Sequence, residues 1–501
     1  MEENLLKEKF VHKDIHGKAY NRRLLIAALM IGSFVSILNQ TLLSTALPQI
    51  MKDFQISAST GQWLTTAFML VNAIMIPLTA LLLEKVSTKK LFIFSMLMFG
   101  IGTIICAFSP SFEFLLAGRI VQAVGAGILA PLVSTVLLLI FPPEKRGAAM
   151  GMYGLVVCFA PAIGPTLSGL IIDKWNWNYL FYITIPIIII DIIFSFIFMK
   201  DIVPLNNPKI DLLSILLSSL GFGAMLFGFS SAGNKGWTDA GVIVSITAGT
   251  ILSAMFVWRQ FAMDNPMLNL SVFKSETFTL TTVIGCILNI ASVGVGIIVP
   301  IFLQSVLGQS AFKSGLVLLP GALMMAAMMM VSGRLFDKYG VKKLAIPGII
   351  LLTVSTIPFT SLQRNTSLMF IMVLYTIRYI GISLAIMPLQ TAGMNDLPKR
   401  LLPHGSAVVN TAKQVVGSIG TAVLITVMSN VTSTNAPDKA LAKTNVGLYK
   451  SGMLDATLKG IDTTFIFMIA LIVIALVMSF FLNSKKPKAD IKEIKEEIQI
   501  A

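Results

Sequence analysis

Charged side chains are scarce in this sequence. Asp, Glu, Lys and Arg make up 12% of its 501 residues, whereas hydrophobic residues make up 55% and the mean hydropathy is +0.83. Soluble domains carry about 25% charged residues. The deficit excludes an ordinary soluble domain and indicates an integral membrane protein.

Cysteine and histidine are also rare. The three cysteines, Cys106, Cys158 and Cys286, lie in apolar runs at no metal-ligand spacing, and the three histidines show none either. This predicts buried reduced thiols, no disulfide framework and no metal site. The sequence has no nucleophile–base set and no phosphate-cradling loop, so we expect no enzyme, no ATP-driven pump and no cofactor.

Negative charge is in deficit, which leaves a formal net charge of +14. A nucleic-acid-binding protein would gather its basic residues on a solvated face with aromatic or groove-reading elements. Here they lie in short segments between apolar runs. We therefore expect no nucleic-acid partner and interpret the charge as a signal of membrane topology.

Long apolar runs dominate the chain. Because a helix needs about 20 apolar residues to cross about 30 Å of hydrocarbon, the sequence predicts fourteen membrane spans. Lys and Arg favour alternate connecting segments by about three to one, as expected when both termini are cytoplasmic. The predicted spans lie near residues 24–47, 61–83, 91–108, 112–140, 147–172, 179–199, 211–231, 241–260, 277–303, 315–335, 343–361, 368–392, 404–430 and 462–483.

The sequence contains an internal repeat. Three segment pairs align in the same order: "ALLLEKVSTKKLFI" with "GRLFDKYGVKKLAI", which matches Glu84 to Asp337; "RGAA" with "HGSA", which matches Arg146 to His404; and the surroundings of Arg119 and Arg378. Repeated halves are common in long membrane transport chains. The repeat predicts six-helix bundles over 24–200 and 263–483, two inserted helices in 201–262, and terminal tails 1–23 and 484–501.

Four motifs resemble those of the major facilitator superfamily. "GRLFDKYGVKK" resembles its cytoplasmic loop motif, "RIVQAVGAG" the fourth-span motif of proton-coupled members, and Gly154 with "PAIGPTLSG" the fifth-span motif typical of exporters. "LQSVLGQSAFKSGLVLLPGAL" resembles the fourteen-span drug:proton antiporter branch, the QacA and EmrB type. The resemblance implies an all-α integral membrane fold, with two six-helix bundles around a midplane cavity plus two inserted helices.

The loop motif predicts a gate on the cytoplasmic side. Asp337 can pair with neighbouring cations or with a helix N-terminus, and Gly340 permits a tight turn. A basic loop that only sets topology would explain the lysines but not this acid and glycine. Glycines and prolines of the fifth span predict close packing and a bend that serves as a hinge or seal. The candidates for gating are Gly154, Pro161, Gly164, Pro165, Gly169, Gly333, Asp337, Gly340, Lys342 and Lys343.

Arg119 places a positive charge inside an apolar span. This costs at least about 2.5–3.5 kcal/mol at the bilayer centre and marks a functional site by default. Arg119 and Gln122 share a helix face, which we expect to point at a central cavity; snorkelling to the outer surface is the alternative. The resemblance implies a role in proton coupling, in which the guanidinium holds a nearby carboxylate ionised.

The carboxylate partner of Arg119 is not obvious. Asn39 occupies the position of the acid in the family's first-span motif, so the usual membrane acid is absent there. Asp191 is the one acid deep within a predicted span, and is either the proton site or a protonated, lipid-facing side chain.

Further polar residues fall inside spans and are candidates for substrate contact. Arg378 and Lys413 could pair with Asp191, receive anionic groups of a substrate, or only hydrogen-bond helix backbones. The amide side chains could instead form hydrogen bonds between helices. The predicted substrate cavity comprises Asn39, Arg378, Asn410, Lys413 and Gln414.

The sequence thus predicts a proton-coupled exporter of small hydrophobic or amphiphilic compounds that works by alternating access. We expect a monomer in the plasma membrane of a bacterium, whose partners are lipid, protons and a small-molecule substrate. One alternative is an exporter of a specific metabolite or anion, favoured by three buried cations against one buried acid. The other is a non-transporting membrane sensor, for which tails of about 23 and 18 residues are too short to form a signalling domain.

Overall fold

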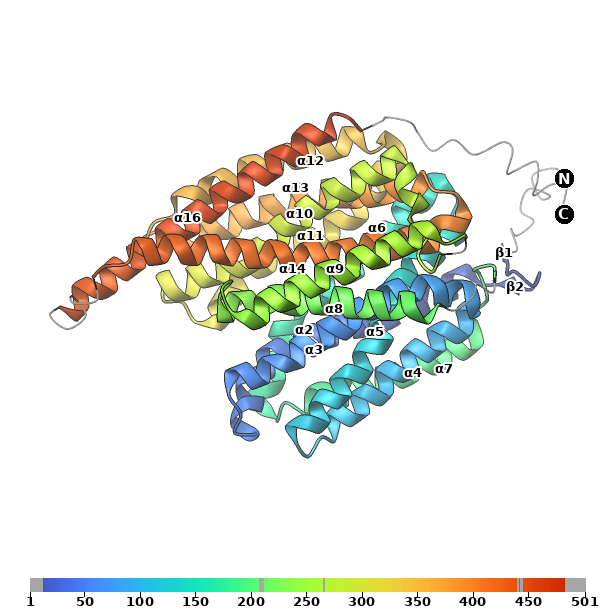
Figure 1. Cartoon of the computed structure of the whole chain (residues 1–501), viewed down its shortest axis with the longest axis horizontal. Helices are drawn as coiled ribbons and strands as arrows, with labels where there is room; N and C mark the ends of the chain where they lie inside the picture. Colours follow the sequence, from blue (N-terminus) through green and yellow to red (C-terminus); the bar gives the residue numbers. More distant parts are fainter. Residues whose placement is uncertain (1–11, 207–210, 265, 439–440, 442–444, 483–501) are drawn as a thin grey trace, which may run out of the picture.

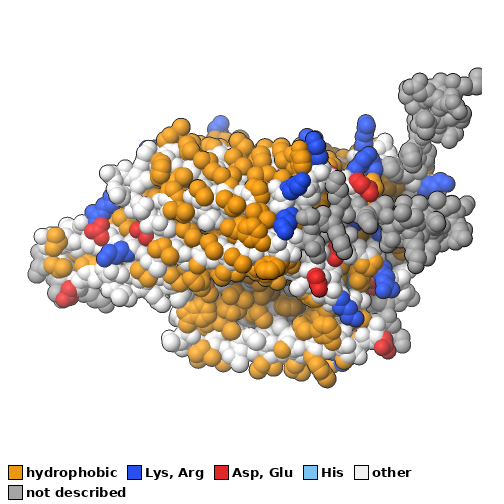
Figure 2. Space-filling model, turned by 90° about the horizontal axis from the view of Figure 1, so that it is seen from above, with side chains coloured by type: hydrophobic (Ala, Val, Ile, Leu, Met, Phe, Trp, Pro, Cys, Tyr) orange, Lys and Arg blue, Asp and Glu red, His pale blue; other side chains and the backbone are white. Residues whose placement is uncertain are grey.

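The computed structural model of the chain describes residues 12–206, 211–264, 266–438, 441 and 445–482. The predicted tail 484–501 and the first eleven residues of the predicted tail 1–23 lie outside the described residues. Fourteen described helices are long and apolar enough to cross a membrane, which confirms the predicted number of spans. Figure 2 shows hydrophobic side chains over the middle of one face, with charged side chains toward its ends.

The long helices run roughly side by side (Figure 1). They are α2 (Arg22–Asp53), α3 (Ala58–Lys85), α4 (Thr88–Ala107), α5 (Phe112–Ile140), α6 (Arg146–Lys174), α7 (Tyr179–Phe198), α8 (Leu212–Lys235), α9 (Ala240–Ala262), α10 (Glu276–Ile301), α11 (Ala311–Tyr339), α12 (Lys342–Thr356), α13 (Leu368–Asn395), α14 (Leu402–Thr434) and α16 (Val446–Ser479). The short elements are β1 (His12–Lys13), β2 (Ala19–Tyr20), η1 (Pro143–Lys145), η2 (Leu270–Lys274), η3 (Phe302–Val306), η4 (Ile357–Ser361) and η5 (Lys399–Leu401).

One packing scheme occurs twice among these helices. In the first six, α5 packs on α3 and α4, α2 on α6, and α7 on α2 and α4. In the last six, α13 packs on α11 and α12, α10 on α14, and α16 on α10 and α12. The inserted helices α8 and α9 pack on each other, and α8 contacts α3 and α14, one helix from each set (Figure 1). Below, the first six are the N-terminal half and the last six the C-terminal half.

The two halves are packed together at one end of the molecule. We call this the terminal end, because α2 begins there and α16 ends there (Figure 1). One buried cluster crosses between the halves at this end and includes Leu83, Leu138, Leu270 and Leu402. At the opposite, far end, each half has a buried cluster of its own. The contact between the halves is therefore concentrated at the terminal end.

The last two long helices differ from the predicted spans. The sequence placed these spans at 404–430 and 462–483, whereas α14 continues to Thr434 and α16 begins at Val446. The side chain of Asn445 caps α16 by accepting a hydrogen bond from the backbone N–H of Leu448. Figure 1 shows both helices extending past their neighbours at the far end. A search for apolar runs misses such turns because their residues are polar.

Candidate functional site

Asp337, near the end of α11, caps the first turn of α6 in the other half. Its Oδ1 accepts a hydrogen bond from the backbone N–H of Gly147, and its Oδ2 accepts one from Ala148, both at 2.9 Å. The first N–H groups of a helix have no partner within the helix, and the helix dipole favours a negative charge beside them. Of the two partners expected for Asp337, the structure supplies the helix N-terminus.

The helices α6 and α11 meet backbone to backbone beside this cap. A Cβ on Gly147 would overlap the carbonyl oxygen of Gly333, and a Cβ on Gly333 would overlap that of Gly147. One turn further, a Cβ on Gly151 would lie 2.9 Å from the carbonyl oxygen of Met329. The glycines therefore permit an approach between the halves that no other residue type would allow.

The other fifth-span candidates lie in α6 but differ in their surroundings. A Cβ on Gly154 would lie 3.2 Å from the Met329 side chain, whereas Gly164 faces Thr41 of α2 in its own half. Gly169 has nothing within 4 Å of its added Cβ, and Pro161 is exposed. Pro165 also falls in α6. In this conformation only the first part of α6 contacts α11 through glycine.

The remaining residues of the loop motif act within the C-terminal half. Gly340 ends α11 with a φ of 80°, the left-handed conformation that favours glycine. Lys342 Nζ donates a hydrogen bond of 2.7 Å to the carbonyl oxygen of Phe480, just past α16, and Lys343 is exposed. The described bond of Lys342 therefore stays within the C-terminal half, and the gating role of the two lysines remains a prediction.

A second polar contact joins the halves at the terminal end. Glu84 of α3 accepts a hydrogen bond of 2.9 Å from Nε2 of His404, in the first turn of α14. Nδ1 of His404 accepts a hydrogen bond of 3.2 Å from the backbone N–H of Asn269, which assigns the Nε2–H tautomer. The repeat had matched Glu84 to Asp337, so this pair is the counterpart of the Asp337 cap. Neither Glu84 nor His404 was predicted to be functional, although the repeat matches them to Asp337 and Arg146.

Arg119 is buried within the N-terminal half, with 1% of its surface exposed. Its Nη1 donates to Asn39 Oδ1 at 3.0 Å and to Gln122 Oε1 at 2.9 Å, and its Cζ lies 4.2 Å above the ring of Phe68. Gln122 Nε2 in turn donates to Thr103 of α4 at 2.8 Å. Snorkelling to the outer surface is therefore wrong for this conformation. The expected opening of this face onto a cavity is also wrong, because its neighbours close around it.

Asp191 of α7 is fully buried, so the lipid-facing alternative is wrong. A Cβ on Gly32 of α2 would lie 2.9 Å from Asp191 Oδ2. Among the described residues, neither carboxylate oxygen has a hydrogen-bond partner. The expected pairing of Arg119 with a membrane carboxylate is not formed, because Asn39 and Gln122 supply amide oxygens in its place.

Arg378 of α13 resembles Arg119 in its environment. It is 2% exposed, and its guanidinium donates to Thr356 Oγ1 and to the carbonyl oxygen of Ala291, each at 2.7 Å. These partners lie at the end of α12 and in α10, the counterparts of α4 and α2. Of the three roles expected for Arg378, the structure favours hydrogen bonding between helices.

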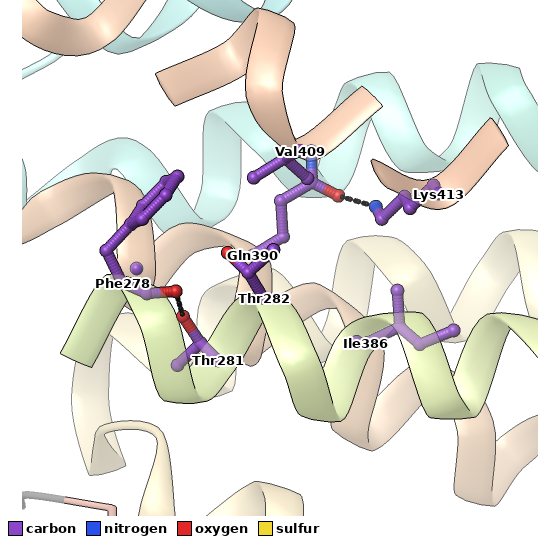
Figure 3. Close-up of a pocket in the computed structure, with 9 residues that line it drawn as sticks. Phe278, Thr281, Thr282, Ile386, Gln390, Val409 and Lys413 are labelled. Atoms are coloured by element: carbon purple, nitrogen blue, oxygen red, sulfur yellow. Dashed lines mark hydrogen bonds between the residues drawn. The ribbon is translucent and has the colours of Figure 1, made fainter. Parts of the chain in front are cut away.

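Lys413 differs from the two arginines because it borders a cavity. Its Nζ donates a hydrogen bond of 2.8 Å to Gln390 Oε1 of α13, and the described residues offer it no carboxylate within ion-pair distance. The two side chains lie beside Thr281 and Thr282 of α10 (Figure 3). The cavity volume is about 10 Å³, about the space of one water molecule. Gln390 was not predicted, because no motif in the sequence marks it.

The other predicted cavity residues do not line this space. Asn410 donates to the carbonyl oxygen of Ser406 in its own helix at 2.8 Å, and Gln414 is half-buried on α14. Asn39 is engaged by Arg119. Of the five predicted substrate contacts, the structure brings only Lys413 to a described cavity.

Known proteins resemble this chain over most of its length. The sequence pattern of the Major Facilitator Superfamily matches residues 29–421. The chain is 46% identical to the uncharacterized MFS-type transporter YcnB of Bacillus subtilis, over 95% of this chain and 98% of that protein. It is 44% identical to the lincomycin resistance protein LmrB of Listeria monocytogenes, over 92% and 97%.

More distant similarities agree in fold. The chain is 28% identical to the multidrug export protein EmrB of Escherichia coli, over 80% of this chain and 79% of that protein. The crystal structure of the human organic anion transporter MFSD10 superposes with a TM-score of 0.61 at 13% identity, covering 90% of this chain and 99% of that one.

Proposed function

The chain belongs to the Major Facilitator Superfamily, and we propose that it is a proton-coupled exporter of small hydrophobic or amphiphilic compounds. The observation that carries this proposal is its similarity along nearly the whole chain to a protein named for lincomycin resistance. The similarity to a protein named for multidrug export supports the same class. Fourteen described helices and two similarly packed halves supply the framework for alternating access.

The contacts between the halves support a gate at the terminal end. We place both termini in the cytoplasm on the bias of Lys and Arg. The conformation is then closed to the cytoplasm by the Asp337 cap, the glycine contact of α6 with α11, and the Glu84–His404 bond. Opening toward the cytoplasm requires these contacts to break as the halves rock.

Asp191 is our candidate for the proton site. It is a buried acid without a hydrogen-bond partner among the described residues, and an isolated ionised carboxylate is costly in such surroundings. Exchange of its proton therefore requires water or a cation to reach it in another conformation. Arg119 and Gln122 tie α2, α4 and α5 together at Asn39, about two helical turns along α2 from Gly32, which faces Asp191, and they act as positioning residues.

Everted membrane vesicles with an acidic interior test this function. Addition of lincomycin or ethidium should release protons, measured with a pH-sensitive dye, and vesicles from cells without the protein should not respond. Release by either compound supports proton-coupled export. Failure of a chemically diverse panel to release protons would contradict the proposal.

Export of a specific anion is the second candidate function. Lys413 supports it, because this lysine borders a cavity and has an amide oxygen as its described partner. Asn39, in place of an acid, removes a negative charge that would attract cations. In the same vesicles, proton release only with anionic compounds, lost in Lys413→Gln, would favour this candidate over the first.

A further inference from the structure

A cavity of about 580 Å³ lies at the terminal end, where the two halves meet. Its walls come from three parts of the chain. Leu139 of α5 represents the N-terminal half, together with Val203 in the segment that follows its last helix, α7. Lys399 and Arg400 of η5, between α13 and α14, represent the C-terminal half, and Lys13 of β1 represents the strand pair β1–β2. No residue of this cavity belongs to the predicted substrate or proton sites.

The size of this cavity suits a small molecule. Ligand pockets in proteins usually measure about 300–1,000 Å³ and combine apolar walls with a few polar groups. The other cavity described, beside Lys413, has a volume of about 10 Å³. Of these two cavities, the space at the terminal end is therefore the one that fits a ligand of many atoms.

The charges around this cavity favour an anion. Lys13, Lys399 and Arg400 contribute three cations from two elements, and all three are exposed at its rim. The two acids in its lining are engaged elsewhere: Asp14 accepts hydrogen bonds from backbone N–H groups in the β1–β2 turn, and Glu84 bonds to His404. These bonds orient the two carboxylates without removing their charge, so three cations face two anions and the lining carries a positive excess of one charge.

The other wall of the cavity is hydrophobic. Val203 is 2% exposed and belongs to the cluster that crosses between the halves, and the half-buried Leu139 packs against that cluster. A small inorganic anion would leave this apolar wall uncovered. A ligand that fills the whole space needs an anionic head and a hydrocarbon portion.

We propose that this cavity binds a phosphate-bearing amphiphile. Its head lies near Lys13, Lys399 and Arg400, where the cations attract the phosphate and the guanidinium can bind two of its oxygens. Its hydrocarbon portion packs on Leu139 and Val203. Because the walls belong to both halves, a bound ligand stabilises the state in which the terminal end is closed. The site borders the proposed cytoplasmic gate through Glu84, but ligand binding there can be measured whether or not the protein transports.

Ligand-dependent thermal unfolding of the purified full-length protein tests the proposal. In a neutral maltoside detergent the probe is hexyl phosphate, a soluble phosphate amphiphile. In nanodiscs, phosphatidylglycerol is compared with phosphatidylcholine. We expect the unfolding midpoint to rise with hexyl phosphate, with phosphatidylglycerol, or with both. The arm that responds distinguishes a soluble ligand from a lipid headgroup.

Matched variants locate the site. Arg400→Gln should weaken the apparent affinity for the responding probe by at least about tenfold, as expected when a charged phosphate contact is lost. Lys13→Gln, at a residue outside the fourteen helices, should also weaken the apparent affinity. This variant replaces Arg400→Gln in the test if Arg400→Gln does not fold. Lys274→Gln removes the same charge from an exposed residue of η2 and should bind like the wild type. The proposal is overturned if neither probe shifts the midpoint, or if all three variants bind equally.

Discussion

Gly147 of the N-terminal half donates its backbone N–H to Asp337 of the C-terminal half at 2.9 Å. The same glycine lies against the backbone of Gly333, four residues before Asp337 on α11. A charge–dipole contact and a close helix crossing therefore coincide at one point between the halves.

Asp337→Asn should favour opening of the terminal end. Loss of the charge beside the N-terminus of α6 should cost the closed state about 1–2 kcal/mol, or about five- to thirtyfold in the conformer ratio. Spin labels at Lys90→Cys and Lys343→Cys, one in each half, would report the longer distance. Asp239→Asn is the control, because Asp239 caps its own helix α9 and joins no halves. An unchanged distance distribution would contradict a latch at Asp337.

Gly333→Ala should reduce transport severely. Alanine is about 0.5–1 kcal/mol better than glycine within a helix, so any loss must come from the overlap of the new Cβ with the Gly147 carbonyl. The control is Gly296→Ala in α10, where an added Cβ has nothing within 4 Å. Drug-dependent proton release in vesicles is the measurement. Equal activity of the two variants would show that the close crossing is dispensable.

Asp191→Asn should separate transport from the proton gradient. The amide keeps the shape of the acid but carries no exchangeable acidic proton, so drug-driven proton release should fall at least about tenfold. Downhill counterflow of substrate should persist. Ser195→Ala removes another buried oxygen one turn along α7 that also has no described partner, and should leave proton release intact. Retained coupling in Asp191→Asn would exclude this acid as the proton site.

Asn39→Asp should place a carboxylate where an amide oxygen lies 3.0 Å from Arg119 Nη1. The resulting buried ion pair restores the acid of the family's first-span motif, and we expect severalfold greater proton release with ethidium. Asn410→Asp adds the same charge at a position that bonds only to its own helix, and should not give this gain. A gain in both variants would trace the effect to net charge and not to Arg119.

The ion pair between Asp211 and Arg259 should make the stability of the inserted helices depend on pH. Asp211, which precedes α8, accepts hydrogen bonds from Arg259 of α9 at 2.7 and 3.0 Å, and this contact lowers the pKa of Asp211 to about 2. Because the folded pKa lies below the ordinary value of 3.8, the pair stabilises the fold above that pH, and the stabilisation is lost as the pH falls toward 2. Asp211→Asn should speed amide exchange in α8 and α9 at pH 7, and its difference from the wild type should shrink between pH 4 and 2. Equal exchange rates at pH 7 would refute a stabilising pair.

The sequence determined the membrane class and the number of spans, because crossing hydrocarbon demands about 20 apolar residues whatever the tertiary packing. It also identified Asp337 as an acid that could pair with neighbouring cations or cap a helix, because a loop that only sets topology would explain the lysines but not this acid and glycine. It placed the last two helices too far apart, because the polar turns that lengthen α14 and α16 carry no apolar signal.

Only the tertiary structure shows which groups the buried polar side chains bond to. A guanidinium in an apolar span must bond to something, but sequence does not show whether this is a carboxylate or an amide, and Arg119 bonds to Asn39 and Gln122. Spacing along the chain likewise could not reveal that Asp337 caps α6, 190 residues away, or that Lys413 meets Gln390. Such pairs depend on how separate helices are oriented, and short-range patterns carry no information about that orientation.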